Sequence, residues 1–298
     1  MALCLLWGGN WVAIKVGVEA IPVLAFTALR SILAGIVLLA LANRRGVGWW
    51  LRRYWPTLLA LSLLTNSLAY AGLFWGTAQV PSGLAALVNL SLMPIALFVF
   101  GLLLGQQRFF WVAAVGLSLG VLGLALLFGQ RLEGPVLSLW GLLAIVGGTL
   151  CYSLGSVLSR RHLARLSPLL ISGLVMVVGG FLLVPLALLA EPLDQTHLQA
   201  LLLPAVAGSL AYLVLASGVV GFTLYLFLLR DWGPLPAGLY AFVSPLVAIA
   251  LGYVLLDETL EATELLGGAL MLSAAALILR TVSPSPPAPP PAARSDPA

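Results

Sequence analysis

The sequence predicts an all-α membrane protein of ten transmembrane helices, arranged as two inverted repeats of five helices each. Three observations lead to this prediction. The 298 residues are 61% hydrophobic and 8% charged, with a mean hydropathy of +1.11, which lies far outside the composition of soluble globular chains. The apolar residues form blocks that match the roughly 20 helical residues needed to cross a bilayer core. The two halves of the chain also resemble each other.

Short polar joints, or joints that contain Pro and Gly, separate ten apolar blocks. Most of these blocks are continuously apolar, which favours helices over the alternating pattern of a membrane β-barrel. The first block begins at Ala2, with no basic segment before it and no cleavage pattern after it, so we interpret it as a retained span. The expected spans are Leu3–Val18, Val23–Ala42, Trp55–Thr77, Ser82–Leu104, Phe109–Phe128, Val136–Leu158, Pro168–Ala190, Ala205–Leu229, Leu235–Leu256 and Leu265–Thr281.

An ungapped shift of 151 positions aligns residues 82–94 with residues 233–245, and it also places Gly101 on Gly252 and Gly116 on Gly267. We therefore expect a first repeat at 1–130, a second at 136–281, and a disordered Pro/Ala-rich tail at 282–298. Because each repeat holds an odd number of spans, the second enters the membrane in the opposite sense. Inverted repeats of this kind place a substrate site at their interface, near the middle of the bilayer.

The basic residues predict which side of the membrane the joints face. If the N-terminus is cytoplasmic, the inner joints hold Arg44, Arg45, Arg52, Arg53, Arg108, Arg160, Arg161, Arg165 and Arg230, with Arg280 and Arg294 near the C-terminus. The outer joints hold Arg131 alone. Because cytoplasmic loops carry the excess of Lys and Arg, both termini are expected in the cytoplasm.

Polar and aromatic side chains follow helical strips in six of the spans, three from each half. Polar groups are costly in lipid unless they find partners or face a cavity, so these strips predict one amphipathic, substrate-binding cavity. Interhelical hydrogen bonds and aromatic packing are the alternative explanation for each residue taken singly. The residues expected to line the cavity are Trp7, Asn10, Trp11, Asn66, Tyr70, Phe74, Asn89, Tyr152, Ser156, Tyr225, Tyr240 and Ser244. Further members of the strips are Ile14, Ser82, Met93, Thr149, Ser153, Ser217 and Gly221.

Arg30 is a charged residue well inside a span. Leaving it unpaired there would cost at least ~2.5 kcal/mol, so it either snorkels outward, pairs with Glu19, or contacts a carboxylate of a substrate. Pro94 and Pro245 occupy matching positions in the two repeats. Each can act as a hinge or as a static kink that shapes the cavity.

No pattern of catalytic, metal-binding or nucleic-acid-binding residues is visible. Cys4 and Cys151 lie in apolar blocks, His162 and His197 lie in separate joints, and their spacing fits no metal site. We expect no cofactor, no metal, no nucleic-acid partner and no enzymatic activity. The GxxxG pairs at 101–105 and 116–120 favour packing within the chain over dimerisation, which predicts a monomer or a weak homodimer in a lipid bilayer.

The chain resembles EamA-type members of the drug/metabolite transporter superfamily. The resemblance rests on Leu6-Trp7-Gly8-Gly9-Asn10, on Ala28-Leu29-Arg30, and on the block from Phe74 to Leu104 with its partner from Leu226 to Asp257-Glu258. It implies ten helices, cytoplasmic termini, a bacterial inner membrane, and export or exchange of small metabolites. The first repeat departs from the family pattern at Gly105-Gln106-Gln107, and the first span lacks a membrane-embedded Glu.

These observations together predict a secondary transporter that exports a small amphipathic metabolite, such as an amino acid, by alternating access. Uptake or exchange of a sugar-like or anionic metabolite is the main alternative. It requires cationic residues at the cavity, for which Arg30 and Lys15 are the candidates. A non-transporting membrane subunit is a further alternative.

Overall fold

The computed structural model describes residues 2–42, 47–77, 79–80, 82–129, 138–163, 167–256 and 262–281. Within these ranges the regular structure is helical, with no strand. Seven helical stretches are long and apolar enough to cross a membrane, and two shorter apolar helices cover 111–127 and 234–247. The prediction of an all-helical chain with membrane-length helices is therefore confirmed. The predicted tail at 282–298 lies outside the described residues.

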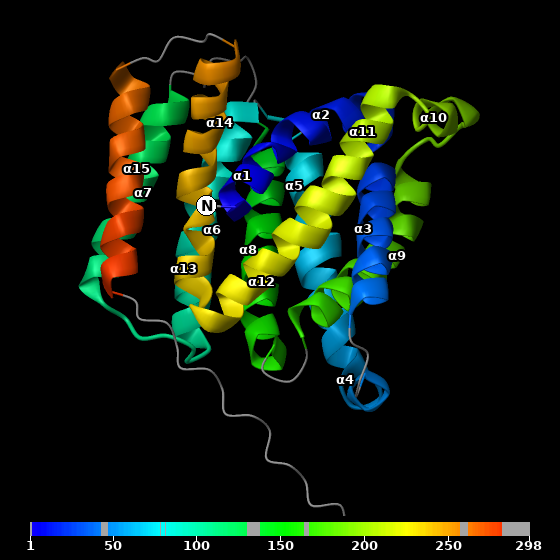
Figure 1. Cartoon of the computed structure of the whole chain (residues 1–298), viewed down its shortest axis with the longest axis horizontal. Helices are drawn as coiled ribbons and strands as arrows, with labels where there is room; N and C mark the ends of the chain where they lie inside the picture. The colour runs from blue at the N-terminus through cyan, green and yellow to red at the C-terminus, as the bar shows by residue number, and fades with distance from the viewer. Residues whose placement is uncertain are drawn as a thin grey trace, which may run out of the picture.

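The helices of the first half are spread across the bundle, with α7 and α3 on opposite sides of it (Figure 1). Their bounds are α1 Ala2–Gly8, α2 Asn10–Ala20, α3 Val23–Leu41, α4 Val47–Ser62, η1 Leu63–Leu68, α5 Ala69–Thr77, α6 Ser82–Leu103 and α7 Trp111–Gly129. The second half contains α8 Leu139–Leu163, α9 Pro168–Ala190, α10 Gln195–Ala200, α11 Pro204–Tyr212, η2 Leu213–Gly221, α12 Phe222–Asp231, α13 Pro234–Gly238, α14 Tyr240–Leu256 and α15 Ala262–Thr281.

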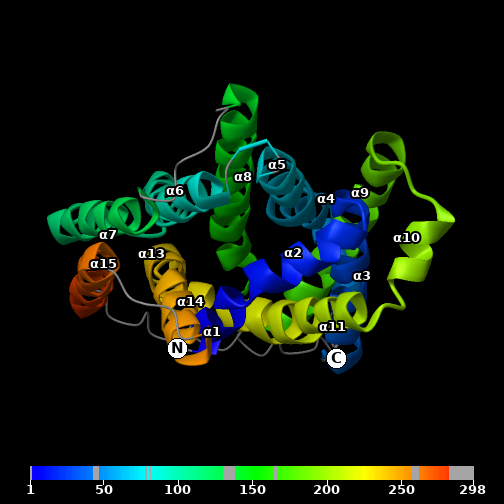
Figure 2. The same cartoon turned by 90° about the horizontal axis from the view of Figure 1, so that it is seen from above.

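The first predicted span is divided at Gly9, so α1 and α2 run in different directions (Figure 2). A long-range contact explains the break. The Tyr212 hydroxyl donates a hydrogen bond to the Leu6 carbonyl across 2.8 Å, and a Cβ at Gly9 would lie 2.5 Å from that hydroxyl oxygen. Glycine leaves room for the tyrosine beside the bent backbone, where any side chain would collide with it.

Two of the long helices contain a π-helical segment. η1 separates α4 from α5, and η2 separates α11 from α12. A π-helix bonds i to i+5, so it rotates the following residues relative to an α-helical strip, and such segments are frequent at functional sites. Asn66 lies in η1 and Ser217 lies in η2.

The bundle is held by close pairs of helices, chiefly α3 with α9, α7 with α15, and α8 with both α5 and α6. Small residues permit these approaches. A Cβ added at Gly148 would come within 2.7 Å of the Ala69 carbonyl oxygen, and one at Gly72 within 2.6 Å of the Ala144 carbonyl oxygen. Gly116 faces Ile278 of α15 in the same way.

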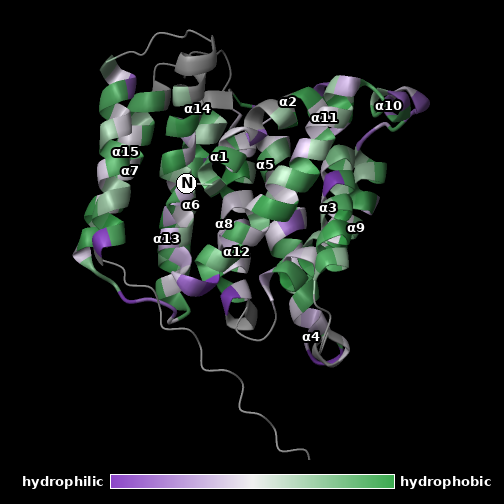
Figure 3. Cartoon of the chain, viewed as in Figure 1, coloured by the Kyte–Doolittle hydropathy of each residue, from purple (hydrophilic) through white to green (hydrophobic). Residues whose placement is uncertain are grey.

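Hydropathy colouring shows apolar residues along the length of the helices (Figure 3). Large apolar side chains such as Ile36, Trp75, Leu122 and Phe181 are exposed on the flanks of the bundle. An exposed apolar surface of this extent is what a lipid-facing protein presents.

Candidate functional site

A cavity of about 120 Å³ lies in the bundle and is lined by residues of both halves. A water molecule needs roughly 10–15 Å³ on the same scale, so this space can hold a small solute. Its wall is formed by α1, α2, α3, α5 and α6 from the first half, and by α8, α9, η2, α12 and α14 from the second.

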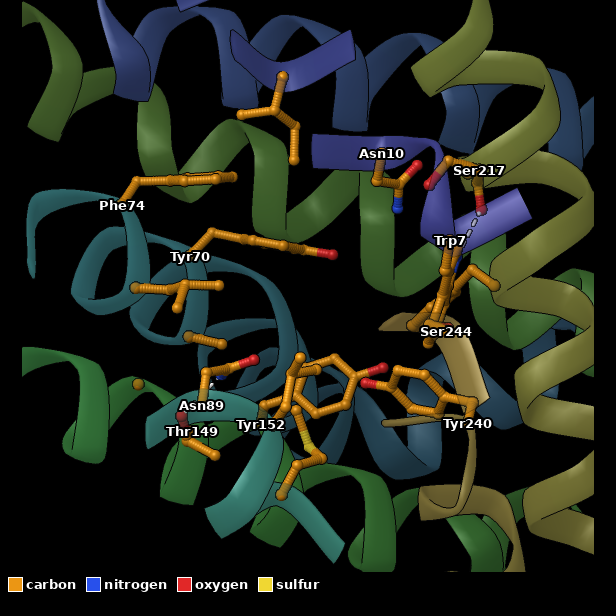
Figure 4. A pocket seen from close by; sticks show the side chains of 18 of the residues that line it. Trp7, Asn10, Tyr70, Phe74, Asn89, Thr149, Tyr152, Ser217, Tyr240 and Ser244 are labelled. Carbon is orange, nitrogen blue, oxygen red and sulfur yellow. Dashed lines mark hydrogen bonds between the residues drawn. The ribbon is translucent and has the colours of Figure 1, made fainter. Parts of the chain in front are cut away.

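The structure brings most of the sequence-predicted site residues to this cavity. The predicted residues that line it are Trp7, Asn10, Arg30, Tyr70, Phe74, Asn89, Tyr152, Tyr240 and Ser244. Four other members of the helical strips, Ile14, Met93, Thr149 and Ser217, also line it. Figure 4 shows Tyr70 and Phe74 pointing across a central space toward Asn10, Trp7 and Tyr240 on the opposite wall.

Three predicted site residues do not line the cavity. Asn66 is buried and accepts a hydrogen bond from the Ser31 hydroxyl at 3.3 Å, so it ties η1 to α3. Ser156 is buried. Tyr225 is fully buried behind the wall, with its ring 5.5 Å from that of Trp7 and 5.8 Å from that of Tyr152. The side chain of Trp11 lies outside the described residues.

Aromatic rings make up much of the lining. The rings of Trp7 and Tyr240 meet edge to face at 4.5 Å, and those of Tyr70 and Phe74 are stacked at 5.6 Å. Tyr225 contacts Trp7, Tyr152 and Tyr240 from behind, so it supports three lining residues at once. Such packed rings offer a rigid apolar surface with polar tips.

Hydrogen bonds fix several lining residues. The Asn89 amide Nδ2 donates to the Thr149 Oγ1 across 2.8 Å, and the Trp7 Nε1 donates to the Ser217 carbonyl across 3.4 Å (Figure 4). The Ser244 hydroxyl faces the Cys4 carbonyl at 3.5 Å. By contrast, the Asn10 Oδ1 is buried and has no protein partner among the described residues.

Arg30 is 5% exposed, and its guanidinium carbon lies 4.4 Å from the centre of the Tyr70 ring. This stacking was not among the sequence expectations. Within the described part of the chain, Arg30 makes no ion pair and its Nε has no hydrogen-bond partner. Glu19, the partner considered from the sequence, is exposed at the end of α2.

Both prolines lie inside helices that contribute residues to the cavity wall. Pro94 is within α6, and Pro245 is within α14. Gly238 packs against Pro94, where an added Cβ would lie 3.2 Å from the Pro94 Cα. A hinge role for these prolines remains a prediction.

Sequence reasoning missed several apolar lining residues, among them Leu73, Met176 and Phe222. The helices of Leu73 and Met176, α5 and α9, are apolar on nearly every side, so hydropathy gives no signal of which face meets the cavity. Among the residues that the structure describes, no cluster of three His, Cys, Asp or Glu residues is placed to hold a metal ion.

Membrane-length helices packed around an amphipathic cavity define the architecture of a polytopic membrane protein. The EamA-like transporter family model matches residues 1–129 and 139–280, and the chain belongs to this family. The family is one of transporters rather than enzymes.

Several curated proteins are similar along nearly the whole chain. The uncharacterized inner membrane transporter YedA of Escherichia coli K12 is 31% identical, over 93% of this chain and 88% of its own length. Protein PecM of Dickeya dadantii is 29% identical, over 91% and 88%. A probable amino-acid metabolite efflux pump of Escherichia coli K12 is 24% identical, over 92% and 91%.

A solved crystal structure shares the fold. It superposes with a TM-score of 0.72 over 93% of both chains, at 22% sequence identity. At 22% sequence identity, the similarity is evidence for a shared fold alone.

Proposed function

We propose that this protein is a secondary transporter that exports a small amphipathic metabolite, such as an amino acid, by alternating access. The observation that carries the proposal is the cavity, which combines aromatic walls with a few fixed polar groups and draws its lining from both halves. Sites of this composition suit small molecules that have an apolar body and a polar head. The relative named as a probable amino-acid metabolite efflux pump supports the same solute class.

We propose ten transmembrane helices in two inverted repeats, at 1–130 and 136–281. Several correspondences support this arrangement. The family model matches twice, once in each half. The π-helical segments η1 and η2, and the prolines Pro94 and Pro245, fall at positions about 151 residues apart. The pairs α3–α9 and α7–α15, which pack together, would be equivalent helices of the two repeats.

The proposed orientation has both termini in the cytoplasm, and the proposed location is the bacterial inner membrane. The start of α4 and the ends of α8, α12 and α15 lie at the lower end of the bundle in Figure 1. Basic residues of these segments are Arg52, Arg53, Arg160, Arg230 and Arg280. Their clustering supports a cytoplasmic lower end, and YedA is named an inner membrane transporter.

Exchange of an anionic metabolite is the second candidate, because Arg30 lines the cavity. A sugar-like solute has no comparable support. A monomer or a weak homodimer remains the proposed state, and the packing of Gly116 against α15 of the same chain supports it.

Flux measurements test the proposal directly. Purified protein in liposomes should accelerate the movement of at least one amphipathic solute in a panel of amino acids and hydrophobic amines. Protein-free liposomes give the background rate. A panel in which no solute moves faster than that background would end the proposal.

A further inference from the structure

Arg30 is a buried charge that the fold does not neutralise within the described residues. The elements that pack against α3 are α9, η2, α5 and α2, and of these four α2 alone contains an acidic residue, Glu19. The carboxylate of Glu191, which follows α9, accepts hydrogen bonds from the Leu24 and Ala25 N–H groups at the start of α3. Glu19 of α2 is exposed. Among the described residues that line the cavity, Arg30 alone is charged, and none carries a carboxylate. The wall therefore carries a net positive charge.

Tyr70 determines which part of Arg30 is available to a ligand. The guanidinium carbon lies over the Tyr70 ring, 4.4 Å from its centre, so the cation contacts the aromatic surface. Stacking of this kind stabilises the charge without using its N–H groups, which lie in the guanidinium plane. The unpartnered Nε belongs to that plane. A planar group that accepts two parallel hydrogen bonds would match it.

The remaining lining distinguishes a carboxylate from an ammonium group. A ligand ammonium would be repelled by Arg30 unless a carboxylate on the same ligand neutralised it. Asn10 Oδ1 and the ring faces of Trp7 and Tyr240 can accept a positive group, but as neutral dipoles and quadrupoles. They are weaker partners for an ammonium than an acid would be. The apolar and aromatic residues that fill most of the wall favour a hydrophobic body.

From this geometry we propose that the carboxylate is the recognised head group of the solute, that Arg30 binds it with Tyr70 holding the guanidinium in place, and that cationic amines without a carboxylate are excluded. This inference rests on the proposed transport function and names its substrate class as amphipathic carboxylates, zwitterionic amino acids included. Arg30 would be the specificity-determining residue of the cavity.

Three probes with one phenyl body test the proposal. They are 3-phenylpropionate, the neutral 3-phenylpropionamide and the cationic 2-phenylethylamine. Calorimetric titration of the purified full-length protein at pH 7.5 measures each affinity. The wild-type protein should bind the carboxylate at least about tenfold more tightly than the amide or the amine, because hydrogen bonds to charged groups exceed neutral ones by this order.

The variants Arg30→Gln and Arg30→Lys assign the preference to its residue. Arg30→Gln should lower the affinity for the carboxylate about ten- to a hundredfold, to that of the amide, and leave the amide unchanged. Arg30→Lys should keep an intermediate preference for the carboxylate, because lysine retains the positive charge but lacks the planar pair of N–H donors that guanidinium offers to a carboxylate. The ratio of the two affinities within one monodisperse sample does not depend on how much protein folds.

A carboxylate preference that survives Arg30→Gln would overturn the proposal. So would wild-type protein that binds the amine or the amide as tightly as the carboxylate, or that binds none of the three. Liposome flux separates this failure from that of the transport function. Solute movement that continues without any preference for carboxylates leaves the transporter standing and removes the role of Arg30.

Discussion

The Asn89 amide donates to the Thr149 hydroxyl oxygen across 2.8 Å and thereby joins α6 to α8 inside the cavity wall. Thr149 donates in turn to the Ile145 carbonyl of its own helix, also across 2.8 Å. The two bonds orient both Asn89 and Thr149. A side chain held in this way presents its remaining polar atom in a defined direction, which is what selective solute binding requires.

Replacement of Asn89 by Leu is expected to slow transport more than it destabilises the fold. Interhelical hydrogen bonds of this kind contribute only about 0.6 kcal/mol on average in membranes, whereas the cavity loses a fixed polar group. Flux in liposomes and thermal unfolding in detergent measure the two effects. Asn10→Leu and Tyr70→Leu should likewise weaken transport while membrane insertion stays intact. Unchanged apparent affinity and rate in all three variants would remove the cavity assignment.

The contact between α5 and α8 should not tolerate a methyl group at Gly148. A Cβ there would lie 2.7 Å from the Ala69 carbonyl oxygen, so Gly148→Ala is expected to destabilise the protein by about 1–3 kcal/mol through overpacking. Gly147→Ala is the matched control, because nothing lies within 4 Å of a Cβ at that neighbouring position. Equal unfolding temperatures for the two variants would contradict the close approach of these helices.

Gln106 fastens the connection after α6 to the end of α8. The side-chain Nε2 of Gln106 donates to the Val157 carbonyl across 2.7 Å. The backbone carbonyl of Gln106 accepts from the Arg160 Nη1 across 3.1 Å. Gln106→Leu removes the side-chain bond. The fraction of molecules in which the connection after α6 has separated from α8 should then rise by about two- to tenfold, which corresponds to the loss of one hydrogen bond of roughly 0.5–1.5 kcal/mol.

Spin labels at Phe109 and Trp232, which are exposed at this end, would report the opening as a longer electron–electron distance. Gln107→Leu serves as the control, since the Gln107 amide bonds the Phe98 carbonyl of the preceding helix instead of α8. Identical distance distributions in Gln106→Leu and wild type would mean that Gln106 does not hold this end closed.

Asp194 caps the short helix α10 outside the membrane-spanning segments. The hydroxyl of Thr196 and then the backbone N–H of His197 donate to its carboxylate, and these bonds hold its pKa below the ordinary value of 3.8. A group with a lowered pKa stabilises the folded state fully above its ordinary value, and this contribution is lost as the pH falls through the lowered value.

Amide exchange across 195–200 should therefore stay uniformly slow between pH 5 and pH 8, after correction for the intrinsic pH dependence of exchange. In Asp194→Ala it should be faster at every pH in that range, because the cap is lost. Gln195→Ala, at a neighbouring position that supplies no cap, should behave as wild type. Wild-type exchange as fast as that of Asp194→Ala throughout this range would contradict the role of Asp194 as the cap.

Hydropathy and helix-start signals are sufficient to place several helices from the sequence. The predicted span Pro168–Ala190 is identical to α9, where Ser167 accepts from the Leu170 N–H and Pro168 occupies the first turn. The break at Gly9 is different, because its cause is a tyrosine 203 positions away in the chain. Short-range patterns carry no information about such a contact.

The candidate site shows the same difference between residues with a local sequence signal and residues placed by long-range contacts. Residues with a polar or aromatic signal in a regular helix, such as Asn10 and Asn89, were predicted from 3.6-residue strips and do line the cavity. Asn66 was placed on the face of Tyr70 by the same rule, but the π-helical turn of η1 rotates it toward α3. The stacking of Arg30 on Tyr70 joins two spans and had no local signal.

Thiol labelling at Asn10 tests most directly whether the cavity is the path of the solute. Asn10→Cys is placed in a protein whose Cys4 and Cys151 are serine, and a membrane-impermeant reagent is added to liposomes that carry out transport. Ile36→Cys, on the apolar flank of α3 at 53% exposure, is the control. We expect the reagent to modify Asn10→Cys, to block flux and to be slowed by the transported solute, while Ile36→Cys stays unmodified. An active transporter whose Asn10→Cys is unreactive, or whose flux is unchanged after modification, would contradict the account.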